Sequence, residues 1–268
     1  MTTLGVVGNI SRDTAEHPDQ QRHLLGGAAL YVALAATQAG ATASPVSVIG
    51  RDLTDALRTP QLAELDLAAV AVVDQPSCHF HLRYDRQGTL IAVDAAFGAA
   101  EQLTAHALQR MHGFDHVHVC CRRPLDPIPV LAALVERGQP FSVDFITASA
   151  ANMIIATAPF LSYARTVFTD INEYALLTRA VVLDRLDAVT VTDGPHPVSL
   201  YRHGELTARA PVQPARAVEV TGAGDTFTGT FLAALLHGVP EELALSRAAD
   251  AATTRIATVG ITLHLQPP

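Results

Sequence analysis

Short apolar runs alternate with helix-like stretches along most of this chain, and this alternation limits its fold more than any other feature. A short apolar run bounded by glycine or polar residues is typical of a strand buried on both faces. Strands separated by helices are typical of a mainly parallel sheet covered by helices. The pattern therefore predicts an α/β fold. We expect strands at residues 4–7, 46–49, 116–120, 141–145, 166–168 and 188–192, and helices at residues 28–39, 129–137, 226–237 and 243–258.

Residues 79–93 contain a different pattern, which predicts a β-hairpin. The stretches 79–84 and 89–93 are rich in β-forming residues, and the residues between them, 85–88, end in a glycine. Glycine supplies the backbone conformation that a tight hairpin turn needs.

The composition indicates one folded domain. The chain has 268 residues, of which 49 % are hydrophobic and 16 % are charged. A chain of this length can bury a substantial core, and this one is too apolar for disorder, so we expect a single domain over residues 1–268. The formal net charge of −8 argues against a nucleic-acid partner.

Lysine is absent from the sequence, and all 18 basic residues are arginine. This absence excludes a Walker-A phosphate loop, the strand lysine of a protein kinase and any enzyme that forms a lysine Schiff base. We attribute the absence to the compositional bias of a GC-rich genome rather than to function.

The cysteines and the apolar runs indicate where the protein works. Three cysteines, two of them adjacent at positions 120 and 121, do not form a disulfide framework. No leader opens the chain, and no apolar run reaches the ~18 residues of a membrane span. We therefore expect a cytoplasmic protein with no membrane partner.

The segment 219–227 contains the most specific chemical signal in the chain. Gly222 and Gly224 leave backbone N–H groups free to approach an anion, and an apolar helix follows directly. A helix N-terminus carries about half a positive charge, so it attracts phosphate oxygens without a lysine. Asp225 lies where that helix begins. A carboxylate there can take the proton from a hydroxyl nucleophile in phosphoryl transfer, and we predict Asp225 as that general base.

Two other interpretations of this segment compete with a phosphoryl-transfer site. Gly-x-Gly is common in turns before helices, so Gly222 and Gly224 could mark an ordinary helix entry with Asp225 as a favourable N-terminal charge. A dinucleotide-binding fingerprint needs a third glycine, but Phe227 occupies that position. A Rossmann oxidoreductase is therefore disfavoured, and the other motifs of the chain favour the kinase over the plain helix entry.

Three motifs resemble one known family. Residues 220–227, Val-Thr-Gly-Ala-Gly-Asp-Thr-Phe, resemble the C-terminal signature of the ribokinase-like (PfkB-type) carbohydrate kinases, Asp-Thr-Thr-Gly-Ala-Gly-Asp-x-Phe. Residues 8–13 followed by 26–27 resemble the family's first strand, substrate aspartate and glycine pair. Residues 192–194, Thr-Asp-Gly, resemble its Thr-x-Gly strand end. The motifs stand in family order over most of the chain, and the features are closest to those of the inositol and nucleoside kinases.

The resemblance implies a fold and an activity. The fold would be a three-layer α/β/α sandwich with a mainly parallel central sheet and a small β lid, formed by residues of roughly 11–25 and 77–97. Lids of this family often pair between two subunits, which implies a homodimer. The activity would be that of a phosphotransferase with an alcohol group as acceptor, acting on a small molecule with ATP as donor and Mg²⁺ as metal.

The resemblance also implies roles for individual residues. Asp225 would be the catalytic base, and Gly222, Ala223 and Gly224 would hold the charge that develops on the transferred phosphoryl group. The residues implied to bind the acceptor are Asp13, Gly26, Gly27 and Tyr31. The residues implied to lie along the nucleotide are Asn172, Thr192, Gly194, Thr221, Gly222, Gly224 and Asp250. For Asp250, a solvated helix charge is the simpler interpretation.

Several positions depart from the family pattern. The family's Asn-x-x-Glu motif, whose glutamate organises magnesium, is present as Asn172 with Ala175 in the glutamate's place. Glu173 is the adjacent metal candidate; otherwise ATP oxygens and water hold Mg²⁺, or Asn172 is simply a helix cap. Glu219 replaces an aspartate that supports a potassium site in many relatives, so we do not expect activation by monovalent cations. Tyr31 stands where ribokinase has a sugar-binding asparagine, which disfavours ribose.

The acceptor is the least determined part of the prediction. The Thr-Asp-Gly motif and the short spacing before it resemble plant-type inositol kinases and favour a polyol or cyclitol. The first alternative is a nucleoside, whose base could lie against Tyr31, Phe80 or Phe97. The second is a catalytically silent sugar-binding relative, which the departures suggest but Asp225 opposes, since a binding module needs no base.

Histidine and arginine pairs are further candidates. Two His-x-His pairs, at 79–81 and 116–118, have the spacing that puts both members on one face of a strand. A metal site would also need a third ligand and supporting hydrogen bonds, and the sequence shows neither. Arg122 and Arg123 follow a predicted strand and could bind an anion in the cleft, although solvated arginines are an equally good interpretation.

Overall fold

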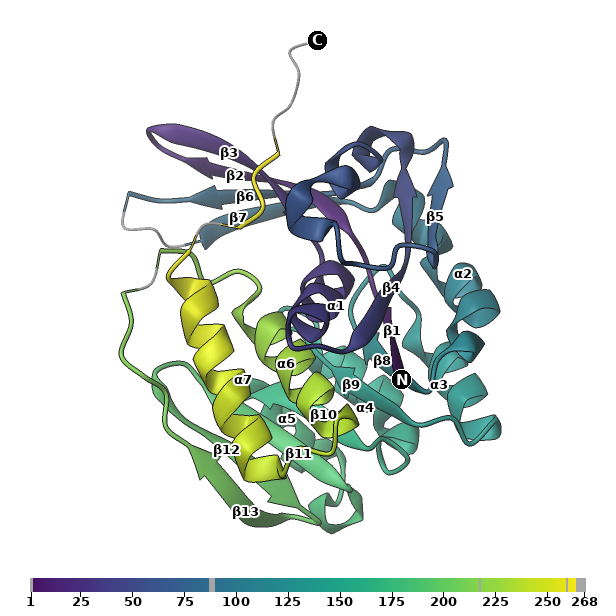
Figure 1. Ribbon diagram of the computed structural model, residues 1–268, viewed down its shortest axis with the longest axis vertical. Helices are drawn as coiled ribbons and strands as arrows, with labels where there is room; N and C mark the ends of the chain where they lie inside the picture. The colour runs from purple at the N-terminus through teal and green to yellow at the C-terminus, as the bar shows by residue number, and fades with distance from the viewer. Residues whose placement is uncertain (1, 87–89, 217, 259, 264–268) are drawn as a thin grey trace.

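The centre of the computed structural model is a nine-stranded sheet in the order β13-β12-β11-β10-β9-β8-β1-β4-β5 (Figure 1). The structure describes residues 2–86, 90–216, 218–258 and 260–263. Every neighbouring pair from β5 to β11 is parallel, whereas β12 and β13 run antiparallel at one edge, which confirms a mainly parallel sheet. Its strands are β1 (Thr3–Val7), β4 (Thr42–Gly50), β5 (Val70–Val73), β8 (His116–Cys120), β9 (Phe141–Asp144), β10 (Thr166–Asp170), β11 (Ala188–Asp193), β12 (His196–Arg202) and β13 (Glu205–Ala210).

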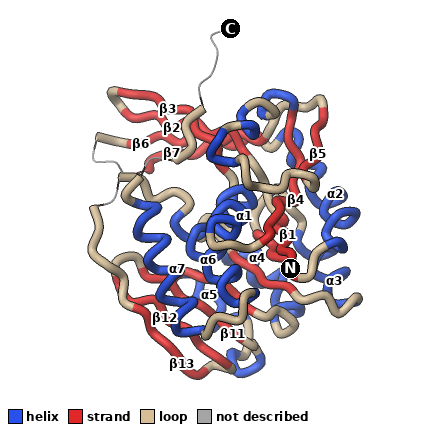
Figure 2. Tube along the Cα trace, viewed as in Figure 1, coloured by secondary structure: helices blue, strands red, loops and turns tan. Residues whose placement is uncertain are grey.

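Helices cover both faces of the sheet and complete the predicted three layers (Figure 2). One face carries α1, α6 and α7, and the other carries α2 to α5. Because parallel strands are buried on both faces, successive residues of β1 enter different cores: Val6 lies under α1 and α6, and Val7 under the opposite layer. The helices are α1 (Ala28–Gln38), α2 (Leu103–Arg110), α3 (Pro127–Glu136), α4 (Ala150–Leu161), α5 (Ile171–Ala180), α6 (Ala223–Leu236) and α7 (Glu241–Ile256), with short 3₁₀ helices at Arg51–Leu53, Ala56–Arg58, Pro60–Leu62, Gly98–Gln102, Met111–Gly113 and Leu183–Arg185.

A four-stranded sheet, in the order β3-β2-β6-β7, forms the predicted lid. The β6–β7 pair is the antiparallel hairpin expected from the sequence, and two of its predicted turn residues, 87 and 88, lie outside the described residues. The β2–β3 pair is a second hairpin that joins β6 in parallel. The lid strands are β2 (Ser11–His17), β3 (Gln20–Gly26), β6 (Cys78–Tyr84) and β7 (Leu90–Ala96).

Several elements have no counterpart in the sequence prediction: β5, β12, β13, α2, α4 and α5. The strands β12 and β13 lie at one end of the sheet and mix polar with apolar residues, so they lack the continuous apolar run of a buried strand. The helix α5 begins with a capping box between Asp170 and Glu173, a signal that was present in the sequence. The helix α6 begins at Ala223, before the predicted residue 226, because Gly222 caps it in a left-handed conformation.

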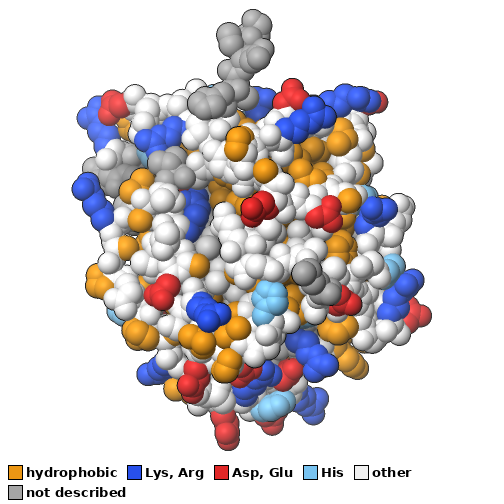
Figure 3. All heavy atoms as spheres, in the orientation of Figure 1, with side chains coloured by type: hydrophobic (Ala, Val, Ile, Leu, Met, Phe, Trp, Pro, Cys, Tyr) orange, Lys and Arg blue, Asp and Glu red, His pale blue; other side chains and the backbone are white. Residues whose placement is uncertain are grey.

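The surface and the helices give two further findings. In the described part of the chain, no helix combines the length and the apolar character that crossing a bilayer would require. On the face drawn in Figure 3, basic and acidic side chains are interspersed rather than gathered by sign. That face therefore presents no continuous basic surface of the kind that binds nucleic acid.

Candidate active site

Three cavities meet at the segment 218–225, between the lid and the C-terminal ends of the parallel strands. Val220 lines all three. We name them after the roles that the sequence predicts for their residues: the acceptor cavity, of about 250 Å³ and lined by Asp13, the phosphate cavity, of about 500 Å³ and lined by Asp225, and the nucleotide cavity, of about 570 Å³ and lined by Gly194. Open α/β sheets bind ligands at this end of their strands. The site therefore has separate room for two ligands and for a group passing between them.

The base candidate, Asp225, lies in the first turn of α6 at the edge of the phosphate cavity. Gly222 caps this helix with a φ of 79°, and a Cβ on it would come within 3.1 Å of the Tyr31 ring. The first N–H groups of a helix have no helical partner. Thr226 is the first residue to bond back, to the Gly222 carbonyl at 2.9 Å. The Ala223 N–H already donates to the Val220 carbonyl at 3.2 Å. The N–H groups of Gly224 and Asp225 are therefore the ones available to an anion.

Arg122 lies beside Asp225 in the phosphate cavity and was only an alternative in the sequence analysis. It follows β8, and its Nη2 donates to Asp144 and lies 3.6 Å from Asp225 Oδ1. Burial disfavours the cation, but the two carboxylates outweigh burial and raise the pKa of Arg122. Burial also raises the pKa of Asp225, and Arg122 offsets only part of that rise. The cavity therefore holds a permanent cation next to a carboxylate with a raised pKa.

Asp144 connects Arg122 to a buried polar group behind it. Burial alone would raise the pKa of Asp144, but Arg122 and His118 outweigh burial and lower it. His118, Cys120 and Asp144 are the one cluster of potential metal ligands among the residues that the structure describes. Burial raises the pKa of the Cys120 thiol well above its ordinary value, so the thiol is neutral, and Asp144 is already paired with Arg122. The cluster is thus arranged to hold Arg122 in place.

The pair at 116–118 has the geometry that its spacing predicted. His116 Nε2 and His118 Nδ1 lie 3.0 Å and 2.9 Å from the same hydroxyl, Ser142 Oγ, on the neighbouring strand. Burial lowers the pKa of His116 to about 3, so this ring is neutral. The other pair belongs to the lid, where His79 contacts Thr14 at 3.0 Å and His81 contacts Glu16 at 2.6 Å.

Asp13 faces the acceptor cavity from β2 and is 7 % exposed. Its Oδ1 is buried and has no hydrogen-bond partner, and burial raises its pKa to about 6. A Cβ on Gly26 would lie 2.0 Å from Asp13 Oδ2, and a Cβ on Gly27, where φ is 103°, would lie 2.2 Å from the Asn9 carbonyl. Gly26 is therefore required by close packing against the carboxylate, and Gly27 by its backbone conformation and by close packing against the neighbouring backbone. Their predicted partner Tyr31 also lines this cavity.

An aromatic pair in the acceptor cavity was missed by the sequence analysis. His17 and Tyr84 come from different lid strands, β2 and β6, and their rings stack with centroids 4.6 Å apart and planes 8° apart. Phe80 and Phe97, which the sequence suggested as a shelf, do not line this cavity among the described residues and instead contact each other at 6.4 Å. Only the fold brings the two lid strands into register, so spacing could not reveal the pair.

The predicted nucleotide residues are distributed over the site unevenly. Thr192, Gly194 and Gly224 line the nucleotide cavity together with Ala223. Thr221 lines the acceptor cavity instead. The three remaining residues, Gly222, Asn172 on α5 and Asp250 on α7, line none of the three cavities. Asn172 and Asp250 are exposed, whereas Gly222 is the cap of α6.

The metal candidate Glu173 is buried and lines the phosphate cavity. Its carboxylate accepts from the Asp170 N–H at 2.9 Å, and Thr147 Oγ1 lies 2.7 Å from Asp170 Oδ2 and 3.3 Å from Glu173 Oε1. Burial raises the pKa of Glu173 to about 7. Ala175 is exposed and offers no ligand. Carboxylate oxygens and water are the ligands that Mg²⁺ prefers, so the pair of Asp170 and Glu173 fits this ion.

The fold and the three cavities around Asp225 are those of a phosphotransferase that acts on a hydroxyl group of a small molecule. The family model described as pfkB family carbohydrate kinase matches residues 2–266. The chain therefore belongs to the pfkB family of carbohydrate kinases.

Individual relatives and solved structures are similar to this chain over nearly its whole length, at low sequence identity. The chain is 28 % identical to the cytidine kinase of Thermococcus kodakarensis over 93 % of its own length and 96 % of that protein. A nucleoside kinase of Burkholderia thailandensis, solved with inosine, superposes with a TM-score of 0.85 at 20 % identity and covers 97 % of this chain and 93 % of that one. A putative ribokinase II from E. coli, solved with ATP and Mg²⁺, superposes with a TM-score of 0.82 at 19 % identity, covering 97 % and 94 %. At these identities the two structures establish the ribokinase-like fold, lid included.

Proposed function

We propose that this kinase transfers the γ-phosphoryl group of ATP to a hydroxyl group of a nucleoside, with Asp225 as the general base. The observation that carries the reaction is the position of Asp225 in the first turn of α6, next to Arg122, where the three cavities meet. Phosphoryl transfer requires a base beside stabilised phosphate oxygens and few other catalytic groups.

Each residue of the phosphate cavity has a task in this reaction. Asp225 accepts the hydroxyl proton while the new oxygen–phosphorus bond forms. The free N–H groups at the start of α6 and the guanidinium of Arg122 stabilise the charge on the transferred group. Mg²⁺, when bound, neutralises phosphate charge, and Asp170 and Glu173 would hold it directly or through water. The lid excludes water, which would otherwise compete as acceptor.

The nucleoside is proposed because of the acceptor cavity. Asp13 Oδ1, which has no hydrogen-bond partner in the structure, can accept sugar hydroxyl groups, and the stacked rings of His17 and Tyr84 offer a flat surface to a base. The similarity to a cytidine kinase over nearly the whole chain supports this choice. The donor is proposed as ATP and the location as the cytoplasm, where ATP is available.

A polyol, cyclitol or free sugar is the second candidate acceptor. It is favoured by the small volume of the acceptor cavity, about 250 Å³, and by the same carboxylate. A silent binding relative is disfavoured because Asp225, Arg122 and the capping Gly222 are all in place.

The function is tested by ADP release from Mg²⁺-ATP over a panel of nucleosides, cyclitols and sugars. We expect a nucleoside to respond, and Asp225→Asn to lower turnover by at least ~10² while acceptor KM changes little. Retained turnover in that variant would exclude Asp225 as the base. Silence of the whole panel, with ligand-induced thermal shifts still present, would favour the silent relative.

A second variant separates the two acceptor classes. Tyr84→Ala should raise the KM of a nucleoside roughly tenfold or more, because it removes one stacked ring. The KM of a cyclitol or free sugar should not change. The matched control is Tyr163→Ala, since Tyr163 is 61 % exposed and lines none of the three cavities.

A homodimer formed through the lids is proposed as the working state. The strand β7 is an edge of the lid, and its residues Ile91 and Val93 are 65 % and 50 % exposed. Exposed apolar edge strands are typical places for pairing with another chain.

A further inference from the structure

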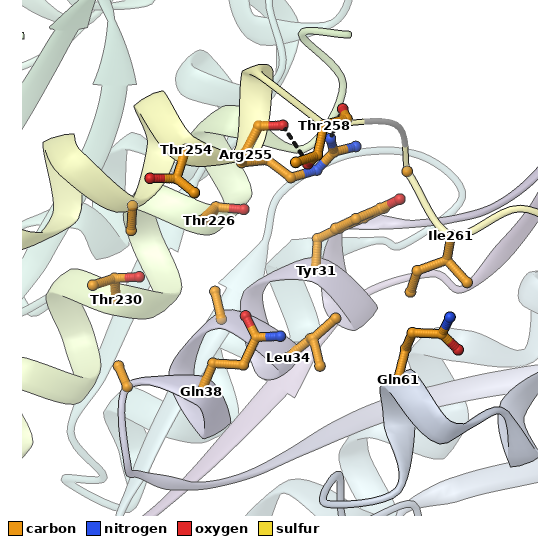
Figure 4. A pocket seen from close by; sticks show the side chains of 14 residues that line it. Tyr31, Leu34, Gln38, Gln61, Thr226, Thr230, Thr254, Arg255, Thr258 and Ile261 are labelled. Carbon is orange, nitrogen blue, oxygen red and sulfur yellow. Dashed lines mark hydrogen bonds between the residues drawn. The ribbon is translucent and has the colours of Figure 1, made fainter. Parts of the chain in front are cut away.

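The last turn of α7 contains an arginine that is nearly buried beside the active site. The side chain of Arg255 is 10 % exposed. Its Nη1 donates to the Thr258 carbonyl at 2.9 Å, its Nη2 lies 3.5 Å from Glu219 Oε1, and its guanidinium lies 5.2 Å from the centre of the Tyr31 ring. Figure 4 shows Arg255 beside Tyr31 and Thr258 at one end of a separate cavity of about 550 Å³ between α1, α6 and α7.

The partners of Arg255 hold the loop that leads into α6. Glu219 Oε2 accepts from the Gly260 N–H at 2.9 Å, and the N–H groups of Val218 and Glu219 donate to the Ile256 carbonyl at 2.7 Å and 3.1 Å. Gly260 is tightly enclosed, since a Cβ on it would lie 2.8 Å from Tyr31 Oη and 3.1 Å from Arg255 Nη2. The C-terminal end of α7 and residues 218–219, at the start of the loop that leads into α6, are thus joined around one guanidinium.

A second set of contacts leads from Arg255 to Gly222, at the start of α6. The Tyr31 ring lies against Gly222, the left-handed cap of α6, and the Tyr31 hydroxyl donates to the Leu25 carbonyl in the lid at 3.1 Å. Arg255 lies over that ring, where a cation is attracted to the aromatic face. Any displacement of the guanidinium would therefore be transmitted through Tyr31 to Gly222 and to the lid.

The charge of Arg255 also affects Asp225. Arg255 Nε and Nη2 are buried and have no hydrogen-bond partner. Because Nε makes no hydrogen bond and Nη2 has only the ion pair with Glu219 at 3.5 Å, this buried cation is a costly arrangement for stability alone. The same charge lowers the pKa of Asp225, opposing the effect of burial.

We infer that Arg255 is a positioning residue whose guanidinium serves as a built-in cation, holding segment 219–222 in the shape that turns the start of α6 toward the phosphate cavity. The inference rests on the proposed kinase reaction. It has one direct consequence: because the cation is part of the chain, phosphoryl transfer needs no monovalent cation from solution, and Glu219 belongs to this pair rather than to a metal site.

The first experiment measures turnover of the wild-type enzyme in potassium, sodium and tetramethylammonium chloride at equal ionic strength. We expect turnover to differ less than about twofold between the three salts, because the guanidinium of Arg255 supplies the cation. Equal ionic strength keeps electrostatic screening the same in all three. Strong activation by potassium alone would overturn the inference.

The second experiment removes the guanidinium. Arg255→Ala should lower kcat by about tenfold or more, since it loosens the oxyanion-binding turn. Because Arg255 lines the cavity of Figure 4, guanidinium ion at millimolar, non-denaturing concentration can enter the space and should restore part of the activity. Arg255→Lys should retain more activity than alanine. The matched control is Arg247→Ala on the exposed side of α7, which should have no effect. Full activity of Arg255→Ala, or no rescue by guanidinium, would overturn the inference.

The third experiment separates positioning from simple charge compensation. The double variant Glu219→Gln/Arg255→Gln removes both buried charges, so its melting temperature should recover relative to Arg255→Gln alone. The kcat of the double variant should stay low if the guanidinium positions the loop. A recovered kcat would mean that Arg255 only neutralises the charge of Glu219. Hydrogen exchange of the peptide 218–224 gives a readout without activity: it should be faster in both variants. If the wild type phosphorylates nothing but exchange still responds, the proposed reaction fails and the positioning of the loop stands.

Discussion

At the scale of residues, burial sets the chemistry of the carboxylates that line the site. Asp13 and Glu173 are buried, the side chain of Asp225 is 15 % exposed, and burial raises the pKa of each. Only Asp225 has a cation, Arg122, within ion-pair distance. The three groups therefore titrate closer to neutrality than free carboxylates do, which suits groups that exchange protons or accept hydroxyl donors.

The pKa of about 6 at Asp13 predicts how acceptor binding depends on pH. Below that pH the carboxyl group is protonated and can no longer accept two hydroxyl donors, so acceptor KM should rise as pH falls. The measurement is KM in steady state between about pH 5 and pH 8, on either side of this pKa. In Asp13→Asn the KM should be high and independent of pH. A wild-type KM that stays constant down to the lower limit would contradict the assignment.

The same pKa has a consequence for stability, with the opposite sign. A pKa raised on folding means that the folded state favours protonated Asp13. This contribution is fully present below the ordinary value of 3.8 and is lost as pH rises through about 6. Asp13→Asn should therefore melt several degrees above the wild type at pH 8, where a stability change of 1 kcal/mol shifts melting by about 2–4 °C. At pH 4 the two proteins should melt together.

At the scale of elements, the start of α6 depends on one residue. Gly222 combines a φ of 79° with a position where a Cβ would lie 3.1 Å from Tyr31. Gly222→Ala should lower the free energy of unfolding by about 1–3 kcal/mol, because alanine is strained in this conformation. Turnover should fall as well, since the first turn of α6 would move. Urea unfolding measures the first effect and ADP release the second.

Gly224 offers a control two residues away in the same turn. A Cβ on Gly224 meets nothing within 4 Å, and its backbone is helical. Gly224→Ala should therefore leave the free energy of unfolding unchanged or raise it by up to about 1 kcal/mol. Equal destabilisation by both substitutions would show that the left-handed cap is not what Gly222 supplies.

The elements that could be predicted are those with a strong local signal. Buried strands such as β1 and β8 and the Ala-rich helix α1 have continuous apolar or helical patterns, whereas β12 and β13 are half exposed and lack one. The same holds for the candidate site: residues in short local motifs could be predicted, and residues outside such motifs could not. Asp13, Gly26 and Asp225 belong to short motifs and could be named, although their roles remain predictions.

The residues that escaped prediction act through partners far away in sequence. Asp144 reaches Arg122 from the neighbouring strand, Tyr84 stacks on His17 across the lid, and Arg255 reaches Tyr31 from the last helix. Asp144 is the last residue but one of the predicted strand 141–145, and that position near the carboxyl edge of the sheet was a usable signal. The other pairs depend on register and helix packing, which a single sequence does not contain.

At the scale of the whole molecule, the lid links the acceptor cavity to the outer surface. Its strand β2 contributes Asp13 to the cavity, and its edge strand β7 exposes Ile91 and Val93. A lid sheet of four strands can be stabilised by the ligand below it, by a second lid, or by both. If a second copy pairs with β7, the shape of the acceptor cavity depends on the dimer.

We therefore expect a dimer in analytical ultracentrifugation at micromolar concentration. Ile91→Asp/Val93→Asp should give a monomer, because it places two charges where apolar side chains would be buried. Its acceptor KM should rise while nucleotide binding is kept, because none of the described lid residues lines the cavity proposed for the nucleotide. Ile155→Asp on α4, where the side chain is 69 % exposed, is the control and should leave the mass unchanged. A monomeric wild type with normal turnover would show that the ligand alone orders the lid, and that the apolar edge of β7 serves the acceptor rather than a second subunit.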